Sequence, residues 1–132
     1  MNRQSGQPPT YRHTPVARIL VVDDDPQYRR VVRIALTARG YGVSEAADGF
    51  LALEEVRAAA FDLVLLDWRM PGMDGGETCR AIRSSRPVPV IVVAAPDREA
   101  EALAAGAEAF FRKPVDAGTL LARIGAVLGR PS

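Results

Sequence analysis

Short apolar runs alternate with amphipathic segments along most of this chain. The run Arg18–Val22 is followed by apolar side chains at positions i, i+3, i+4, i+7 and i+8 of Tyr28–Leu36, which predicts a strand and then a helix. Asp25 and Pro26 are residue types that favour a helix start, and Gly40 is one that favours a helix end. This order of strand and helix occurs five times in all.

The four later units follow the same order. The predicted strands are residues 42–45, 62–66, 88–93 and 109–111, and the predicted helices are 48–58, a segment after the 71–76 loop that carries Cys79 and Ile82, 97–105, and a segment that starts after Asp116. Three of the strands are apolar throughout rather than alternating, which favours a parallel sheet with helices on both faces. We therefore predict a doubly wound, five-stranded α/β domain, (βα)5, over residues 16–130. Residues 1–15 lack periodicity and are predicted to form a flexible tail.

Size and composition agree with a single domain. The chain has 132 residues, of which 48% are hydrophobic, and this is enough to bury a core of its own. The single cysteine, Cys79, excludes an internal disulfide, fits a reducing compartment and lies on the apolar side of its predicted helix, so we expect it in the core. The apolar runs have the length of strands and are too short to cross a membrane as a helix. We therefore expect a cytoplasmic domain with no membrane partner.

The charges nearly cancel. The chain has seventeen basic and sixteen acidic residues, which gives a formal net charge of +1. This balance argues against a nucleic-acid-binding surface within the chain. All of the basic residues except Lys113 are arginines. The ammonium group of Lys113 is therefore chemically distinct from the guanidinium groups that supply the rest of the positive side-chain charge.

Acidic residues gather where the predicted strands end. The first strand is followed by Asp23, Asp24 and Asp25, the third ends at Asp67, and the fifth leads to Lys113. Ligands of doubly wound sheets bind beyond the carboxyl ends of the strands, so we expect these side chains to meet. Carboxylates held together raise one another's pKa unless a cation neutralises them. Mg²⁺, a hard cation that prefers oxygen ligands, fits such a site best.

A metal-neutralised carboxylate beside an ammonium group can receive a phosphoryl group, and the carboxylate itself can be the nucleophile. Other aspartates have a simpler explanation. We expect Asp25, Asp48, Asp97 and Asp116 to cap helices, because each comes directly before a helical pattern, and Asp74 to be a turn residue.

Three segments, Ile19–Pro26, Asp62–Gly75 and Arg112–Pro114, together resemble the receiver domain of two-component response regulators. The resemblance extends from residue 16 to the C-terminus, and the order, spacing and strand-end placement of the motifs all agree. It implies a flavodoxin-like, CheY-like fold. It also implies a signalling module rather than an enzyme, one that catalyses only its own phosphorylation and dephosphorylation.

The resemblance assigns a role to each motif residue. Asp67 would be the phosphoacceptor, receiving the phosphoryl group from a sensor histidine kinase or a phosphotransfer protein. Asp24 would ligate Mg²⁺ directly, Asp23 would act through water or orient the metal, and Asp67 and the backbone carbonyl of Arg69 would complete the protein ligands. Lys113 would pair with the phosphoryl oxygens.

Four features of the chain from the fourth strand onward bear on the conformational switch that phosphorylation would cause. Phe110 matches the aromatic position whose rotation accompanies the switch in the family, although it is equally a core residue of a buried strand, and Pro114 matches a position that follows a cis peptide bond. Ala94 stands where the family has Thr or Ser, and residues 87–118 contain neither. The segment 94–106 is also shorter than usual by nearly a helical turn, which indicates an atypical receiver.

Three functions follow from these patterns. The first is a phosphoacceptor receiver that binds a kinase and an unidentified downstream protein, with a homodimer also possible. The second, motivated by Ala94, is a degenerate receiver that acts as a constitutive interaction domain. The third is a phosphatase of the haloacid dehalogenase type, with Asp23 as nucleophile and Asp25 as acid. Trp68 is expected either to line the site or to be a partly exposed surface residue.

Overall fold

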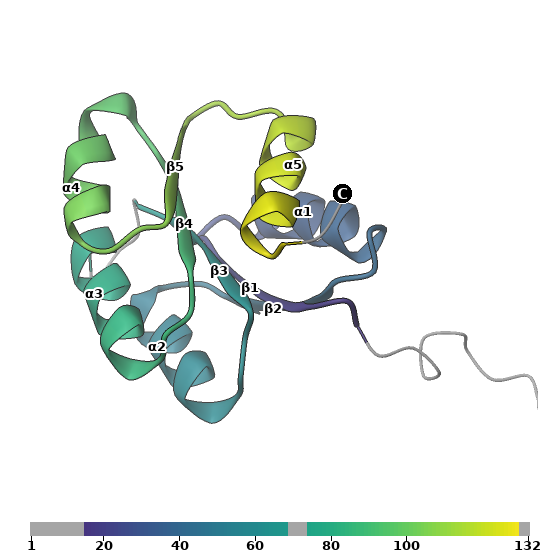
Figure 1. The fold of residues 1–132 in the computed structure, drawn as a ribbon, viewed down its shortest axis with the longest axis horizontal. Coiled ribbons are helices and arrows are strands. Elements are labelled where there is room, and N and C mark those ends of the chain that lie inside the picture. Colours follow the sequence, from purple (N-terminus) through teal and green to yellow (C-terminus); the bar gives the residue numbers. More distant parts are fainter. Residues whose placement is uncertain (1–14, 69–73, 130–132) are drawn as a thin grey trace, which may run out of the picture.

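The computed structural model describes residues 15–68 and 74–129, and within them five parallel strands form one sheet in the order β2-β1-β3-β4-β5 (Figure 1). The strands are β1 (Arg18–Val22), β2 (Gly42–Ala46), β3 (Leu63–Asp67), β4 (Val90–Ala94) and β5 (Ala109–Arg112). The predicted doubly wound (βα)5 fold is confirmed. Residues 1–14 lie outside the described part, so the predicted tail stays a prediction.

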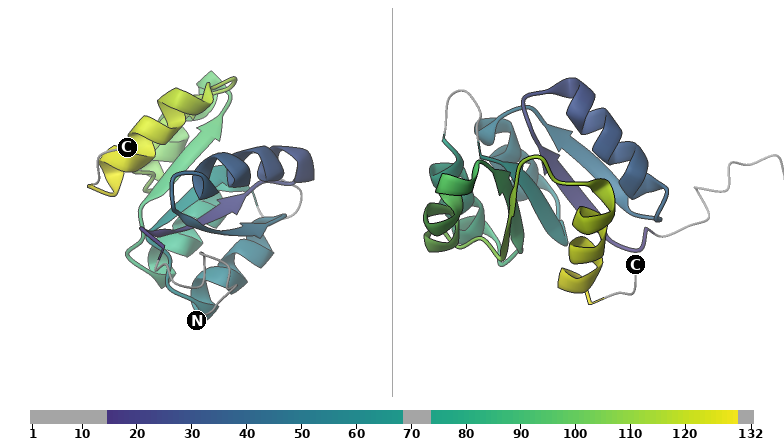
Figure 2. Two further views of the ribbon diagram at one scale, coloured as in Figure 1. Left: turned by 90° about the vertical axis from the view of Figure 1, so that its right-hand side faces the viewer. Right: turned by 90° about the horizontal axis from the view of Figure 1, so that it is seen from above.

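The sheet lies between two layers of helices, seen most clearly in Figure 2. One layer holds α1 (Pro26–Thr37) and α5 (Ala117–Val127), and the other holds α2 (Gly49–Ala58), α3 (Gly75–Ser85) and α4 (Glu99–Ala104). Successive residues of β1 point to opposite layers: Ile19 packs with the α1/α5 core and Leu20 with the α2–α4 core. Two buried faces explain why the central strands are apolar throughout.

Burial falls from the centre of the sheet to its edges. Every residue of β3 and β4 is buried, whereas the edge strands β2 and β5 are mostly half-buried. The alternative that made Phe110 a core residue of a fully buried strand is right in that Phe110 packs against the core, but β5 is not fully buried, because it has a neighbouring strand on one side only. Within the described ranges, no helix is long and apolar enough to cross a membrane.

Side-chain caps start three of the helices as the sequence predicted. Asp25, Asp48 and Asp116 each accept a hydrogen bond from a backbone N–H in the first turn of α1, α2 and α5. Asp74 caps α3 in the same way and forms a capping box with Glu77, so it does more than the turn residue that we expected.

The segment between β4 and β5 differs from its prediction. A single helix was expected over 97–105, but a 3₁₀ turn (Pro96–Arg98) precedes an α4 of six residues. The Arg98 N–H donates to the Ala95 carbonyl three residues back at 3.1 Å, which is the tighter 3₁₀ spacing. The predicted cap at Asp97 was therefore wrong, since α4 starts only at Glu99 and follows Arg98, which makes no side-chain cap.

Trp68 is buried, with 5% of its surface exposed, and packs in the α2–α4 core. The expectation of a partly exposed surface residue was wrong. Its indole lies against the backbone at the start of α3: a Cβ atom at Gly75 would be 2.6 Å from Cδ2 of Trp68 and 2.8 Å from its carbonyl oxygen. Glycine at position 75 is what lets the residue after Asp67 reach the core.

We predict that Gly75→Ala lowers the free energy of unfolding by about 1–3 kcal/mol, because the new methyl group overlaps both the ring and the backbone of Trp68. Urea denaturation followed by circular dichroism measures the change. Gly76→Ala is the matched control, since its Cβ would meet Arg80 and Asp74 side-chain atoms at an ordinary 3.4 Å. Equal stabilities for the two variants would contradict this account of the Trp68 packing.

Candidate functional site

The strand register brings Asp23 and Asp67 side by side. Val22 pairs with Leu66 across β1 and β3, so the residues that follow, Asp23 and Asp67, lie at the same level of the sheet. The chain winds outward from these two adjacent strands in opposite directions, to β2 on one side and to β4 and β5 on the other. This is the position at which doubly wound sheets bind their ligands.

Three carboxylates meet there. One oxygen each from Asp23, Asp24 and Asp67 lies within 4.8 Å of the others. Asp23 and Asp67 are buried, with 3% and 6% of their surface exposed, whereas Asp24 is exposed. The juxtaposition predicted from the strand ends is therefore present, with two of the carboxylates removed from water and the third open to it.

Lys113, which follows β5, contacts Asp67. Its Nζ atom donates to Oδ1 of Asp67 at 2.8 Å. Its backbone N–H donates to the Ala94 carbonyl at 2.9 Å, and the Lys113–Pro114 peptide bond is cis, as the resemblance implied. The ammonium thus reaches the acidic cluster from the end of β5, across the end of β4.

The surroundings of the Asp23 carboxyl disfavour its ionisation. Its pKa is raised from 3.8 to about 6, with burial as the largest cause; the hydrogen bond from the Asp25 N–H acts to lower it, and the negative charge of Asp67 raises it further. Lys113 opposes the Asp67 contribution only in part. Because the folded-state pKa lies above the unfolded value, the ionised Asp23 disfavours folding at neutral pH, and this cost disappears as the pH falls through about 6 towards 4. A bound cation would relieve the same cost.

The remaining predicted residues lie at different distances from this cluster. Ala94 ends β4 and is buried at 4% exposure, so a methyl group stands where the resemblance expects a hydroxyl. Phe110 lies in β5, half-buried, and packs against the α2–α4 core. Arg69, whose carbonyl was expected to complete the ligands, lies outside the described residues.

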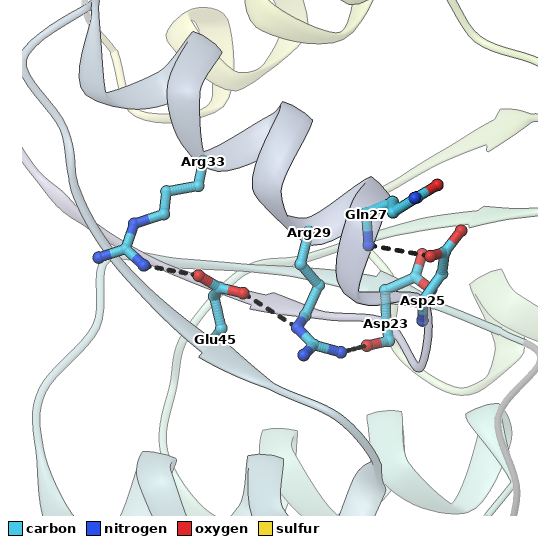
Figure 3. A network of polar contacts seen from close by, with 6 residues as sticks. All are labelled: Asp23, Asp25, Gln27, Arg29, Arg33 and Glu45. Atoms are coloured by element: carbon cyan, nitrogen blue, oxygen red, sulfur yellow. Dashed lines mark hydrogen bonds and ion pairs between the residues drawn. The ribbon is translucent and has the colours of Figure 1, made fainter.

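Two residues of α1 that the sequence patterns did not predict for the site also interact with it, Arg29 through hydrogen bonds and Tyr28 through electrostatics. Arg29 on α1 donates to the backbone carbonyl of Asp23 at 2.6 Å and to Glu45 on β2 at 3.0 Å (Figure 3). The phenol of Tyr28 responds to the same charges, because burial and then the carboxylates of Asp23 and Asp67 raise its pKa. Among sixteen arginines no local pattern marks position 29; its only signal is one turn of helix after the cap at Asp25.

The arrangement combines four chemical features. It offers oxygen ligands for a hard divalent cation, a buried carboxylate as nucleophile at Asp67, a positive group at Lys113, and an opening to solvent at Asp24. Together these suit transfer of a phosphoryl group to a carboxylate, where the cations offset the charge on the equatorial oxygens.

Comparison with known sequences places the chain among signalling proteins. It is 38% identical over 118 residues to the transcriptional regulatory protein ResD of Bacillus subtilis, covering 87% of this chain and 49% of ResD. It is 44% identical over 117 residues to the response regulator MprA of Mycobacterium leprae, covering 86% of this chain and 51% of MprA. The chain thus spans about half the length of these curated relatives.

Solved structures give the same result for the fold. The chemotaxis response regulator CheY4 of Vibrio cholerae superimposes with a TM-score of 0.78 at 35% identity, covering 84% of this chain and 98% of CheY4. The receiver domain of the sensor histidine kinase PA1611 of Pseudomonas aeruginosa, solved with a magnesium ion in its active-site cleft, gives 0.79 at 30% identity and covers 86% and 98%. The sequence profile of the response regulator receiver domain matches residues 19–125. With this match, its CheY-like fold and its acidic strand-end site, the chain belongs to the response regulator receiver domain family.

Proposed function

We propose that Asp67 is the phosphoacceptor of a two-component phosphorelay and that it takes its phosphoryl group from a histidine kinase or a phosphotransfer protein. The observation that carries this proposal is the meeting of Asp23, Asp24 and Asp67 within 4.8 Å, with Lys113 2.8 Å from Asp67. Membership of the receiver family supports the same assignment.

Mg²⁺ is the cation that we propose for the carboxylate cluster. The donor set fits, because it consists of oxygen ligands of which two are buried, and because the Asp23 carboxyl is costly to ionise without a positive neighbour. A similar receiver domain, that of PA1611, has been solved with magnesium in its cleft. Asp24 would be a direct ligand, with Asp23 acting through water or orienting the ion. When bound, the cation would offset negative charge on the incoming phosphoryl oxygens.

The step we propose uses this chain's own groups as follows. A carboxylate oxygen of Asp67 forms a bond to phosphorus while the bond from phosphorus to the imidazole nitrogen of the donor histidine breaks. The imidazole keeps that electron pair and takes up a proton. Lys113, already beside Asp67 at 2.8 Å, is placed to neutralise a phosphoryl oxygen of the resulting acyl phosphate. Apart from forming and hydrolysing this bond, no catalytic activity is proposed.

The proposed partners follow from the family. Full-length relatives are about twice as long as this chain, and one of them, MtrA of Mycolicibacterium smegmatis, is named a DNA-binding response regulator. For the receiver domain itself we propose output through contacts with a downstream protein and no contact with nucleic acid, in keeping with the near-zero net charge. A cytoplasmic location is part of this proposal.

The phosphatase alternative is not favoured. It needs Asp25 as a general acid, but Oδ1 of Asp25 accepts the Gln27 N–H at 2.9 Å and caps α1. It also gives no role to the Lys113–Asp67 pair. The chain's membership of the receiver family also argues against a phosphatase of this type.

Ala94 changes how we propose that phosphorylation is transmitted. A methyl group cannot donate a hydrogen bond to a phosphoryl oxygen, so the β4–α4 segment has no side-chain link to the site at this position. Lys113 does have such a link, through its bond to Asp67, and its backbone continues through Pro114 to the α5 cap at Asp116. We therefore propose that the phosphoryl group acts mainly on the β5–α5 junction.

We predict that Asp67→Asn abolishes labelling by a small acyl phosphate donor such as acetyl phosphate, because an amide cannot form the acyl phosphate. Intact-protein mass spectrometry detects the added phosphoryl group in the unchanged chain. Asp25→Asn is the control, since asparagine caps a helix as well as aspartate does, and it should keep full labelling. Labelling that survives Asp67→Asn would contradict the assignment.

We predict that Mg²⁺ changes the fluorescence of Trp68, the single tryptophan, in a saturable way, because its buried indole directly follows Asp67. Asp67→Asn should weaken the apparent affinity for Mg²⁺ at least ~10-fold. Loss of a metal ligand should weaken binding no less than loss of a residue that orients a ligand, which already costs that much. No response at millimolar Mg²⁺ in either protein would count against the metal site.

We predict that beryllofluoride with Mg²⁺, a mimic of the phosphoryl group, shifts backbone amide NMR signals at 112–117 more than at 94–98. In Ala94→Ser, which adds a hydroxyl at the end of β4, the shifts should extend into 94–98. The reverse distribution in the unchanged chain would contradict a route through Lys113. Unchanged signals throughout 94–117 would favour the constitutive interaction domain.

A further inference from the structure

Arg29 connects the β1–α1 loop, residues 23–25, to β2 at the edge of the sheet. From the second turn of α1 its Nη1 donates to the backbone carbonyl of Asp23 at 2.6 Å, and its Nε donates to Oε1 of Glu45 at 3.0 Å. Figure 3 shows the guanidinium between the end of β1 and the Glu45 carboxylate of β2. One planar group therefore spans two segments, which a guanidinium can do because its donors are fixed in a fork.

Glu45 is itself held from both sides. Oε2 accepts from Arg33, one turn further along α1, at 2.7 Å, so the carboxylate lies between two guanidinium groups (Figure 3). The next residue of β2, Ala46, accepts the Asp23 N–H at 3.1 Å. The backbone of Asp23 is thus bound to β2 directly through its N–H, and indirectly, through Arg29 and Glu45, by its carbonyl.

The two arginines differ in how much their contacts can contribute. The side chains of Arg29 and Glu45 are 17% and 25% exposed, whereas that of Arg33 is 55% exposed. Charge-assisted hydrogen bonds shielded from water are the stronger kind, and exposed ion pairs contribute little. Arg29 is therefore the member of the network that restrains the loop, and Arg33 a peripheral one.

Arg29 positions the backbone of Asp23 and does not neutralise the Asp23 carboxylate directly. The charged groups that shift the pKa of the Asp23 carboxyl are Asp67, Lys113 and Asp24, while Arg29 donates to the main-chain carbonyl of the same residue. The Asp23 carboxylate is aimed separately, by the Asp25 N–H at 2.9 Å. With N–H, carbonyl and carboxylate all bonded, Asp23 has little freedom to move away from Asp67.

We propose that Arg29, oriented by Glu45, is a positioning residue for the metal site: it fixes the β1–α1 loop so that the carboxylates of Asp23 and Asp24 face Asp67. The inference rests on the proposed function, since it concerns the same carboxylates. Arg29 touches neither the metal nor the phosphoryl group and acts through the backbone of Asp23. Loss of the fork should therefore weaken cation binding without removing a ligand.

The test is Mg²⁺ titration of Trp68 fluorescence in Arg29→Met, with Arg33→Met as the matched control. Both variants lie on α1, remove one positive charge and take one guanidinium from Glu45, but only Arg29→Met releases the Asp23 carbonyl. Arg29→Met should weaken Mg²⁺ binding about 10-fold or more, as expected when the group behind a ligand is lost. Arg33→Met should change it less than about twofold.

A second variant and a second measurement separate positioning from stability. Arg29→Lys keeps the charge and the aliphatic stem, but a single ammonium cannot reproduce the fork, so it too should weaken Mg²⁺ binding. Hydrogen exchange at the Asp25 amide, which bonds to Asp23, should quicken in both Arg29 variants beyond any change in global unfolding. Thermal unfolding without Mg²⁺ gives the global change.

The outcomes distinguish this inference from the proposed function. If the unchanged chain binds Mg²⁺ and both Arg29 variants bind it within about twofold, the positioning role is overturned while the receiver function stands. A lower unfolding temperature with unchanged Mg²⁺ affinity likewise assigns Arg29 a purely structural role and overturns the proposal. If the unchanged chain shows no saturable response, the metal site fails and this inference fails with it.

Discussion

The burial of two like charges at the ends of adjacent central strands is the constraint on which this domain depends. Asp23 and Asp67 are almost inaccessible to solvent, and burial together with the nearby charge of Asp67 disfavours ionisation of Asp23 in the folded state. Lys113 offsets part of that cost from across the sheet. The part of the cost that Lys113 does not offset favours binding of a further cation at this site.

The rest of the fold holds those charges in place. Apolar side chains on both faces of β1, β3 and β4 pack into the two helix layers and fix the strand register, and the register decides that Asp23 and Asp67 are neighbours. The edge strand β2 contributes differently. It buries less, but Ala46 and Glu45 bind the backbone of Asp23, directly and through Arg29. Core strands place the carboxylates, and the edge strand restrains the loop that carries them.

The far side of the site is built from different contacts. At Ala94 the site meets a methyl group, and the helix that follows is reduced to six residues after a 3₁₀ turn. A polar link between Asp67 and the end of β5 runs through Lys113, whose backbone N–H donates to the Ala94 carbonyl. A phosphoryl group at Asp67 would lie beside the ammonium group of Lys113, which is connected through the backbone to α5. It would find no hydroxyl group at the end of β4, and this difference makes the chain an atypical receiver.

Most of the elements and the residues of the acidic site could be predicted from the amino-acid sequence. Periodicity located five strand–helix units because burial on one or two faces imposes a spacing on apolar residues, and strand-end positions predicted the meeting of Asp23, Asp24, Asp67 and Lys113. Features that depend on neighbours distant in the chain could be seen only in the folded domain. The burial of Trp68 against Gly75, the half-buried Phe110 on an edge strand, and the choice of Arg29 among sixteen arginines all follow from packing between elements, which no local pattern encodes.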